Sequence, residues 1–444
     1  MKNPFLELYG GRTLGFFGIG KSNLALLSML SGTGVPIILR SDKKIRREIL
    51  PRDLNICGFF EEDLAAQNIH EDVLIFSPSV RRDRPEFLSA EAKGCRFTSD
   101  FEIFLEFNKK PIFLVTGSDG KSTTTTLAAA MLGADFPAIG NIGTPAVAAL
   151  SMDARGYVIE ASSFMLEYAK PVARRGVLTS LSENHLDWHG SFSEYASVKI
   201  RGVTDAEETV ISADSPAIFY AFSGKKVFAV CSQNFSEDEL KKSFRAELYY
   251  STSGGYILRN GEPIFDLAEA YRKEDFNIKN YLNALALTDG FADEERRIDV
   301  IRNFRGLPHR CEIFAEACGV KFINSSIDTS PERTISTLKS LPHGLIILLG
   351  GRDKNLDFTS LAALISECGD VPIIYGEARE KISRAFGAYQ YFGAENFRQA
   401  VELAIKKAKT GDTVLLSPAA SSYDEFSSFE ERGNLFKSLI IERI

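Results

Sequence analysis

Short apolar runs that alternate with amphipathic segments predict an α/β protein along the whole chain. Val73–Phe76 and Pro111–Val115 have the length of buried strands, and Ser122–Leu132, which follows the second run, has the composition of a helix. Strands that alternate with helices in this way form mostly parallel sheets. Further strands are expected at Thr13–Phe17, Pro36–Leu39, Tyr157–Glu160, Gly176–Leu181 and Val227–Val230, with a helix at Ser22–Leu30.

The second half of the chain adds a hairpin and another run of alternating elements. Glu247–Thr252 and Tyr256–Arg259 flank a Ser-Gly-Gly turn, which predicts a β-hairpin. Ile278–Phe291 is amphipathic with a helical period, and the charged segment Glu294–Phe304 follows as another helix. Beyond it, strands are expected at Glu312–Glu316, Val320–Asn324, Leu345–Leu349, Pro372–Tyr375 and Thr413–Leu416, and helices at Pro331–Leu341, Phe358–Glu367, Phe397–Lys409 and Phe429–Ile441.

The length of the chain divides these elements among domains. At 444 residues the chain is too long for one core and suggests two or three domains, at about 100–200 residues each. The run Arg305-Gly306-Leu307-Pro308 is typical of a linker. We therefore expect three domains, at residues 1–109, 110–305 and 306–444.

Composition and charge exclude several classes of protein. A net charge of −7 argues against a general nucleic-acid binder, which needs a basic face. The six cysteines are scattered without a C-x-x-C pair, as in a reducing cytosol. Lys2-Asn3-Pro4 does not lead into an apolar signal core, and no apolar run approaches the roughly 20 residues that span a bilayer. We expect a cytoplasmic protein without membrane or nucleic-acid partners.

The clearest chemical signal is a glycine-rich loop between an expected strand and an expected helix. Its sequence matches G-x-x-G-K-[ST], in which glycines turn backbone N–H groups toward an anion and the helix N-terminus adds positive potential. The lysine reaches the terminal phosphates and the hydroxyls can hold Mg²⁺. An ordinary glycine-rich turn is the alternative, but strand, loop, lysine and hydroxyl occur in the required order. The candidate ATP-binding residues are Gly117, Ser118, Asp119, Gly120, Lys121, Ser122 and Thr123.

Polar residues at the ends of later strands are candidates for the rest of this site. Glu160 ends an apolar strand, and a carboxylate there suits Mg²⁺, although a helix cap is the alternative. His185 lies in a cluster of two histidines and two acids within seven residues after another strand, which favours a metal or phosphate site over a structural histidine. Tyr195 and Lys199 lie one helical turn apart, a pairing that by itself assigns no role. Asn280 and Asn283 share a helix, where exposed asparagine is an equal alternative.

A second ligand site is expected near the N-terminus. Gly18-Ile19-Gly20 is a tight turn after the first strand, and a diphosphate-bearing ligand at this turn is possible. Asn23 stands where a dinucleotide-binding fold would favour glycine, which makes the dinucleotide signal weak. Ser77-Pro78-Ser79 forms another turn at the carboxyl end of a strand, where open α/β sheets bind ligands.

The order of these motifs resembles the Mur ligase family along almost the whole chain. The segments that carry the resemblance are TGSDGKSTT, GNIGTP, IEASSF, SENHLD, YxxxK, NxxNALA, GLPHRCE, LLGGRDK and LSPAASSYDEFSSFEERG. The ending and GLPHR are most similar to the members that add D-glutamate to UDP-N-acetylmuramoyl-L-alanine. The resemblance implies an N-terminal Rossmann-like domain for the UDP-sugar, a central P-loop ATPase-type domain, and a C-terminal Rossmann-like domain that brings the amino acid.

The resemblance also implies a mechanism and the residues that perform it. ATP would phosphorylate the substrate carboxylate, and the amine of D-glutamate would attack the acyl phosphate, in a monomeric enzyme of peptidoglycan precursor synthesis. Lys121, Glu160, His185 and Lys199 would be catalytic; two Mg²⁺ ions would be held by Ser122, Glu160, His185 and Lys199, with Lys199 carbamylated. Asn280, Asn283, His309 and Arg310 would bind the nucleotide; Asn141, Ser162, Ser163, Thr329, Lys354, Ser422 and Phe429 would bind the other substrates.

The chain departs from the family pattern at two places. Asp119 replaces the usual asparagine of the phosphate loop. Residues 325–330 read Ser-Ser-Ile-Asp-Thr-Ser instead of Asp-Ser-Lys-Ala-Thr-Asn, so the acid and the lysine are absent. Another amino-acid ligase of the Mur or folylpolyglutamate type, or a catalytically weak binding homologue, remains the alternative. Domain closure between the central and C-terminal domains is also expected.

Overall fold

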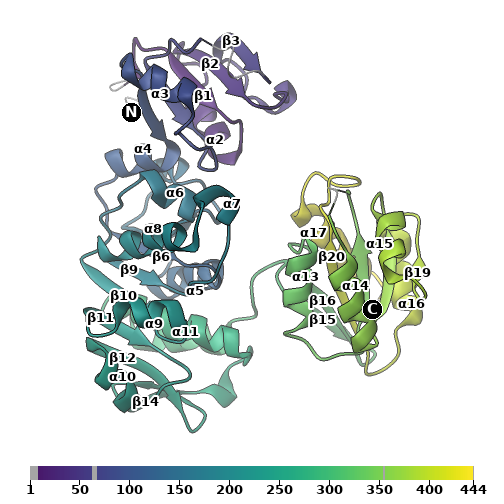
Figure 1. The fold of residues 1–444 in the computed structure, drawn as a ribbon. Coiled ribbons are helices and arrows are strands. Elements are labelled where there is room, and N and C mark those ends of the chain that lie inside the picture. Colours follow the sequence, from purple (N-terminus) through teal and green to yellow (C-terminus); the bar gives the residue numbers. More distant parts are fainter. Residues whose placement is uncertain (1–8, 63–67, 354–355, 444) are drawn as a thin grey trace. The chain divides into compact units, whose positions relative to one another are not determined.

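The computed structural model describes residues 9–62, 68–353 and 356–443, and the chain forms two compact units, Met1–Asn303 and Phe304–Ile444. Their strands build three separate sheets (Figure 1). Two of these sheets belong to the first unit and one to the second. The prediction of a three-part α/β fold is therefore confirmed.

The N-terminal sheet is parallel and has the strand order β3-β2-β1-β4-β5. The chain runs outward through one half and then returns to the other side of β1, so the strand order reverses between β1 and β4. Helices α2 and α3 contribute to separate apolar clusters around the sheet. The elements are β1 (Leu14–Phe17), α2 (Lys21–Leu30), β2 (Pro36–Ser41), β3 (Asn55–Glu61), β4 (Val73–Phe76), α3 (Pro85–Ala92), β5 (Arg96–Ser99) and α4 (Asp100–Phe107).

The central sheet has the order β14-β13-β12-β11-β10-β9-β6-β8-β7, with β6 between β8 and β9. Its strands pair in parallel except that β13 pairs antiparallel with both β12 and β14. The predicted hairpin, formed by β12 and β13, is therefore confirmed. The strands are β6 (Ile112–Thr116), β7 (Ala138–Gly140), β8 (Tyr157–Glu160), β9 (Arg175–Leu178), β10 (Glu208–Ser212), β11 (Lys226–Cys231), β12 (Arg245–Ser253), β13 (Tyr256–Arg259) and β14 (Glu262–Asp266).

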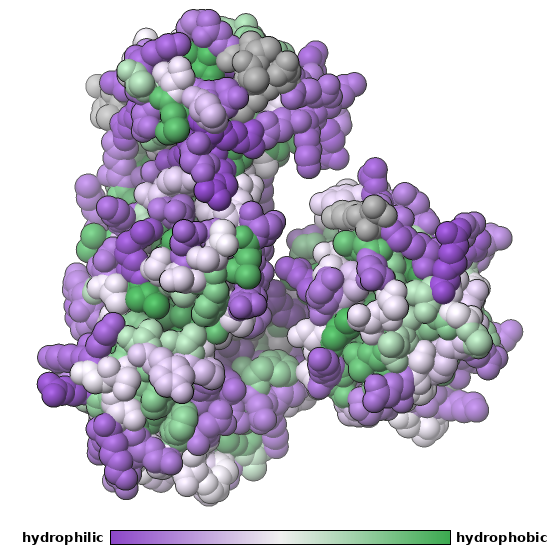
Figure 2. All heavy atoms as spheres, viewed as in Figure 1, coloured by the Kyte–Doolittle hydropathy of each residue, from purple (hydrophilic) through white to green (hydrophobic). Residues whose placement is uncertain are grey.

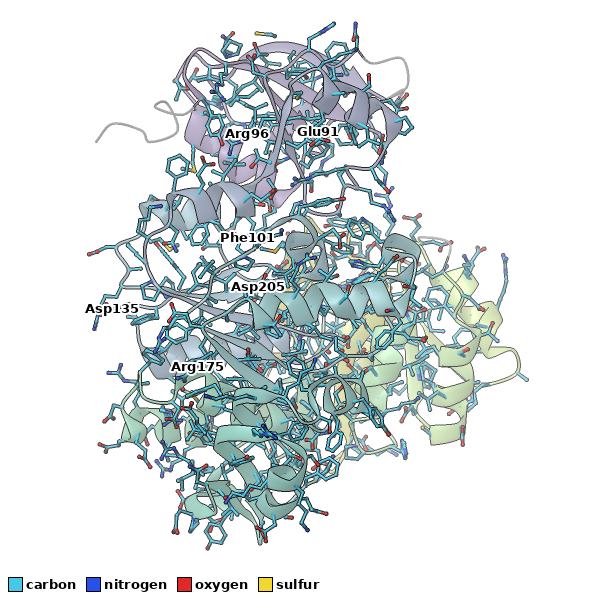
Figure 3. All side chains as sticks on the ribbon, turned by 60° about the vertical axis from the view of Figure 1, so that its left-hand side comes forward. Glu91, Arg96, Phe101, Asp135, Arg175 and Asp205 are labelled. Carbon is cyan, nitrogen blue, oxygen red and sulfur yellow. The ribbon has the colours of Figure 1, made fainter. Side chains whose placement is uncertain are left out.

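Helices cover this sheet, and its buried apolar residues pack in separate clusters. Phe101 from α4, labelled in Figure 3, is fully buried in the same cluster as Tyr157 and Ile159. That shared cluster joins α4, which follows the N-terminal sheet, to the central core. The helices are α5 (Lys121–Leu132), α6 (Ser163–Tyr168), α7 (Leu186–His189), α8 (Phe192–Thr204), α9 (Pro216–Phe222), α10 (Glu237–Ser243), α11 (Asp275–Thr288) and α12 (Glu294–Asn303).

The second unit has one sheet of order β15-β16-β20-β17-β18-β19, in which β15 alone pairs antiparallel. One apolar cluster contains residues of α16 and α17, and the other contains residues of α13, α14 and α15. The elements are β15 (Glu312–Ala317), β16 (Val320–Asn324), α13 (Pro331–Leu338), β17 (Ile346–Gly350), α14 (Thr359–Cys368), β18 (Val371–Tyr375), α15 (Arg379–Phe386), β19 (Phe392–Gly393), α16 (Phe397–Lys407), β20 (Thr413–Ala419) and α17 (Phe429–Ile441).

The surface carries scattered apolar side chains among polar ones. The face in Figure 2 is a mosaic of hydrophilic and hydrophobic residues. Tyr220 is the most exposed large aromatic side chain in the described part of the chain, at 81%. Within that same part, none of the helices combines the length and apolarity needed to cross a bilayer.

Candidate active site

The phosphate loop joins β6 to α5, and its two glycines have no room for a side chain. A Cβ atom on Gly117 would lie 2.1 Å from Thr179 Oγ1, and one on Gly120 would lie 2.4 Å from Asn280 Oδ1. Both glycines have positive φ, 151° and 78°. The glycines are therefore required by close contacts with neighbouring strand-end and helix residues as well as by the backbone conformation.

Residues after β9 hold the loop in place. Thr179 Oγ1 donates to the Asp119 carbonyl at 2.6 Å, and the Asp119 N–H donates to Ser180 Oγ at 2.8 Å. The Ser118 N–H donates to the Ser180 carbonyl at 2.9 Å. The sequence analysis missed Thr179 and Ser180, although two hydroxyls directly after a buried strand are a signal for this role. The Asp119 side chain itself is exposed.

Lys121 and the residues after it stand at the N-terminus of α5. Lys121 Nζ donates to the Ser118 carbonyl at 2.8 Å, so the ammonium lies back over the loop. Ser122 is partly exposed and Thr123 is buried in the same helical turn. A cation and a free helix N-terminus beside a glycine loop form an anion-binding arrangement.

Lys199 is buried directly beneath the loop. Its side chain is 2% exposed, and Nζ donates to the Gly117 carbonyl at 2.8 Å. Burial lowers the pKa of Lys199 well below the usual range, and the charge of Lys121 lowers it further. One turn earlier, the Tyr195 hydroxyl lies 3.0 Å from Ser118 Oγ. The Tyr195/Lys199 pair thus contacts the phosphate loop, which spacing alone did not reveal.

Glu160 ends β8 with one carboxylate oxygen unpaired. The residue is 2% exposed, and Oε1 accepts a 2.8 Å hydrogen bond from Asn141 Nδ2. Oε2 is buried without a hydrogen-bond partner among the described residues. A buried oxygen of this kind fits a hard divalent cation, which prefers carboxylate ligands. No group of three or more His, Cys, Asp or Glu suited to a metal occurs in the described residues, so a metal here needs hydroxyl, water or modified-lysine ligands as well.

The two histidines that follow β9 occupy different environments. His185 is exposed, with a φ of 54° at the start of α7, and its ring lies 4.8 Å from that of Phe164. His189 is 5% exposed and its ring lies 5.4 Å from that of Tyr195. Burial, followed by the charge of Lys199, lowers the pKa of His189 to about 4. His185 is therefore the histidine that a ligand can reach.

The predicted substrate and nucleotide residues of the first unit have varied surroundings. Ser162 caps α6 by accepting from the Met165 N–H at 3.3 Å, and Ser163 is buried at the start of that helix. Asn280 Oδ1 accepts from Thr124 Oγ1 at 3.3 Å. Asn280 and Asn283 are 5% and 1% exposed, so the alternative of exposed asparagines is wrong.

The N-terminal ligand turns lie where the strand order reverses. A Cβ on Gly18, after β1, would lie 3.0 Å from Ser77 Cβ, after β4. The Asn23 side chain donates to the Gly18 carbonyl at 2.7 Å and to the Ile75 carbonyl at 3.4 Å. Asn23 thereby ties the two strand ends together, a role that its weak dinucleotide signal did not suggest. Such reversal points are the usual ligand sites of open α/β sheets.

In the second unit, the predicted amino-acid residues gather at the carboxyl ends of β16 and β20. Ser422 is buried, and the Phe429 carbonyl accepts from Ser326 Oγ at 2.8 Å. Thr329 is half-buried in the loop after β16. The structure also reveals Arg432, fully buried, which donates from Nε to Ser326 Oγ at 3.0 Å. Lys354 lies outside the described residues.

The structure also gives the surroundings of His309 and Arg310 and of the altered 325–330 stretch. His309 is 6% exposed, its Nδ1 lies 3.0 Å from Asn324 Nδ2, and Arg310 beside it is half-buried. Burial lowers the pKa of His309. The altered 325–330 stretch still contains a buried acid, Asp328. Its Oδ2 atom accepts 2.8 Å hydrogen bonds from the side chains of Thr337 and Ser417.

The chain matches known proteins over nearly its whole length and two family models over its central and C-terminal parts. Residues 115–288 match the Mur ligase middle domain, and residues 309–420 match the Mur ligase, glutamate ligase domain. A UDP-N-acetylmuramoylalanine–D-glutamate ligase of Ruminiclostridium cellulolyticum is 31% identical, with 95% of each chain covered. One of Clostridium tetani is 31% identical over 99% of this chain and 98% of the relative. The crystal structure of a UDP-N-acetylmuramate-alanine ligase from Thermotoga maritima has a TM-score of 0.59 at 17% identity, covering 98% and 100% of the two chains, which is a likeness of fold.

Proposed function

Because the chain belongs to the Mur ligase family, we propose that it is the ATP-dependent ligase that joins D-glutamate to UDP-N-acetylmuramoyl-L-alanine in peptidoglycan precursor synthesis. The observation that carries the proposal is the preformed phosphate loop, with Lys121 over it and two buried ionisable groups, Lys199 and Glu160, close by. The choice of substrates follows the names of the two relatives described above. The enzyme acts as a monomer in the cytoplasm.

The first step transfers the γ-phosphate of ATP to the carboxylate of the UDP-sugar substrate. One P–O bond to ADP breaks and one P–O bond to the carboxylate forms, giving an acyl phosphate. Both reactants are anions, so their approach requires positive charge. Lys121 and the N-terminus of α5 supply that charge from the chain. Mg²⁺, held by Ser122, Glu160 and His185, would neutralise the transferred phosphoryl group further.

Lys199 completes this metal site as a carbamate. Burial lowers the pKa of Lys199 and so favours the neutral amine, which is the form that adds to CO₂. The new N–C bond forms with loss of one proton and turns a cationic group into an anion. The two carbamate oxygens would add anionic metal ligands to the Glu160 carboxylate, whose Oε2 atom is buried without a hydrogen-bond partner among the described residues.

The second step joins the amine of D-glutamate to the activated carbonyl. Nitrogen attacks carbon, a proton is lost, and inorganic phosphate leaves. We assign binding of D-glutamate to Thr329, Lys354, Ser422 and Phe429 in residues 306–444. The nucleotide is assigned to residues 110–305, with Asn280 and Asn283 joined by His309 and Arg310. The UDP-sugar is assigned to residues 1–109, and its reacting end to Asn141, Ser162 and Ser163.

Phosphate release tests the proposal directly. The protein is incubated with Mg·ATP and UDP-N-acetylmuramoyl-L-alanine, with D-glutamate, and with both, and the product is weighed by mass spectrometry. We expect release that needs both substrates and a product heavier by one glutamyl residue. Release that needs neither substrate, or none in any mixture, would refute the function; a heavier product from another amino acid would correct the acceptor.

Lys121→Ala tests the phosphate loop within the same assay. Loss of the ammonium removes a positive charge from the developing transition state, so turnover falls by at least about 10²-fold. Lys170→Ala, which removes an exposed lysine of the same domain, is the matched control and retains activity. Equal activity of the two variants would remove Lys121 from the mechanism.

A further inference from the structure

Trp188 forms a direct link between the N-terminal ligand turn and the turn that carries His185. Its indole Nε1–H donates to the Ser79 carbonyl at 2.9 Å. Arg81 donates to the Trp188 carbonyl and lies over the indole at 5.5 Å from the ring centroid. Residues 77–84, which follow β4, therefore hold both the backbone and the ring of a residue in α7.

On its other side, Trp188 packs against the site described above. Its ring lies 5.0 Å from that of Phe164 and 4.6 Å from that of His189. Phe164 contacts the His185 ring, and His189 contacts Tyr195, whose hydroxyl reaches the phosphate loop. Rings packed edge to face have few alternative arrangements, so a shift of the indole displaces its neighbours.

We propose that Trp188 is a positioning residue that couples occupancy of the N-terminal sugar-nucleotide site to the placement of His185 and the phosphate loop. The inference rests on the proposed function for the identity of the ligand at residues 77–84. Those residues lie beside the Gly18 turn, where the strand order of the N-terminal sheet reverses between β1 and β4. A diphosphate bound there contacts the segment to which the Trp188 side chain is hydrogen-bonded. Binding there orders residues 77–84, and the indole transmits that order to α7.

The coupling has a thermodynamic signature that turnover alone does not provide. If the sugar nucleotide favours the arrangement that suits nucleotide and metal, each ligand must improve the affinity of the other by the same factor. Isothermal calorimetry gives this factor as the ratio of the Kd values of UDP-N-acetylmuramoyl-L-alanine without and with Mg²⁺ and a non-hydrolysable ATP analogue. We expect a ratio of about 5 or more in the unaltered protein.

Trp188→Phe keeps an aromatic ring against Phe164 but removes the indole N–H that donates a hydrogen bond to the Ser79 carbonyl. We expect its ratio to fall to within about twofold of 1, while the Kd of the sugar nucleotide alone changes little. Arg81→Gln weakens the same link from the other side and should lower the ratio in the same direction. Tyr220→Phe, at an exposed aromatic of the same unit, is the matched control and keeps the ratio.

The chain contains one tryptophan, so its emission reports on this residue alone. We expect the sugar nucleotide to change the emission of the unaltered protein and of Tyr220→Phe. A ratio near 1 in the unaltered protein, or an undiminished ratio in Trp188→Phe and Arg81→Gln, would overturn the inference. Absence of sugar-nucleotide binding and of turnover would instead refute the proposed function, so the two failures are distinguishable.

Discussion

Replacing Gly120 by alanine isolates the contact that shapes the phosphate loop. Gly120 has a φ of 78°, and an added Cβ would lie 2.4 Å from Asn280 Oδ1. The nearest atom of any other side chain, Thr179 Cβ, would lie at an ordinary contact distance of 3.8 Å. The substitution therefore introduces two separable costs, a strained backbone and a collision with one side chain.

The two costs have different magnitudes. A left-handed conformation costs alanine about 1 kcal/mol. Displacing Asn280 from its rotamer costs about 1 kcal/mol, and losing its hydrogen bond with Thr124 costs about 1 kcal/mol more. Gly120→Ala should thus destabilise the first unit by about 3 kcal/mol, but by only about 1 kcal/mol in an Asn280→Ala background, where the collision is absent.

Differential scanning calorimetry of the four proteins of this cycle measures the difference. About 3 kcal/mol corresponds to a fall in Tm of about 6 °C for a unit of this size. Gly254→Ala is the matched control, because Gly254 has a φ of 57° with no atom within 4 Å of an added Cβ. It should therefore lower Tm by about 2 °C.

The reasoning fails if Gly120→Ala is no more destabilising than Gly254→Ala. It also fails if Asn280→Ala leaves the cost of Gly120→Ala unchanged, because the collision would then not be the cause. Binding of ATP, measured by calorimetric titration, should weaken in Gly120→Ala and remain unchanged in Gly254→Ala.

Three further substitutions test other parts of the structure. The pKa of His189 is about 4 in the folded protein and about 6.5 in the unfolded protein, so between these values the unfolded state binds more protons and stability falls as the pH drops from 7 to 4. In urea titrations, the unaltered protein should lose roughly 2 kcal/mol more of its unfolding free energy over this range than His189→Phe does. Parallel stability curves for the two proteins would refute this prediction. Lys199→Ala should lose at least about 10²-fold in turnover and regain part of it with added short-chain carboxylate, which replaces the carbamate. Rescue of Lys199→Met by chloride to the same degree would argue against a carbamate. Asn23→Ala removes the side-chain hydrogen bonds to the Gly18 and Ile75 carbonyls and should cost about 2 kcal/mol. Asn55→Ala, at an exposed site, should cost under about 0.5 kcal/mol in the same urea titration.

Much of the fold was predictable because the strands are buried on both faces and read as apolar runs. Val73–Phe76 and Phe429–Ile441 have the bounds that their patterns indicated. One of the strands that the sequence analysis did not predict is β3, whose exposed and half-buried positions roughly alternate around a central glycine, without a continuous apolar run. Its pairing with β2 supplies the stabilisation that its own composition does not indicate.

The amino-acid sequence by itself determined the order of the elements, the phosphate loop and the family, because these depend on local residue types and spacing. Only the tertiary structure decided that Lys199 lies beneath Gly117 and that Asn280 fills the space beside Gly120, since these partners are 82 and 160 residues apart along the chain. The same holds for Trp188, whose partner Ser79 is 109 residues away. Burial and long-range contact set the pKa of a lysine and the role of an indole, and neither is encoded in the residues adjacent to them.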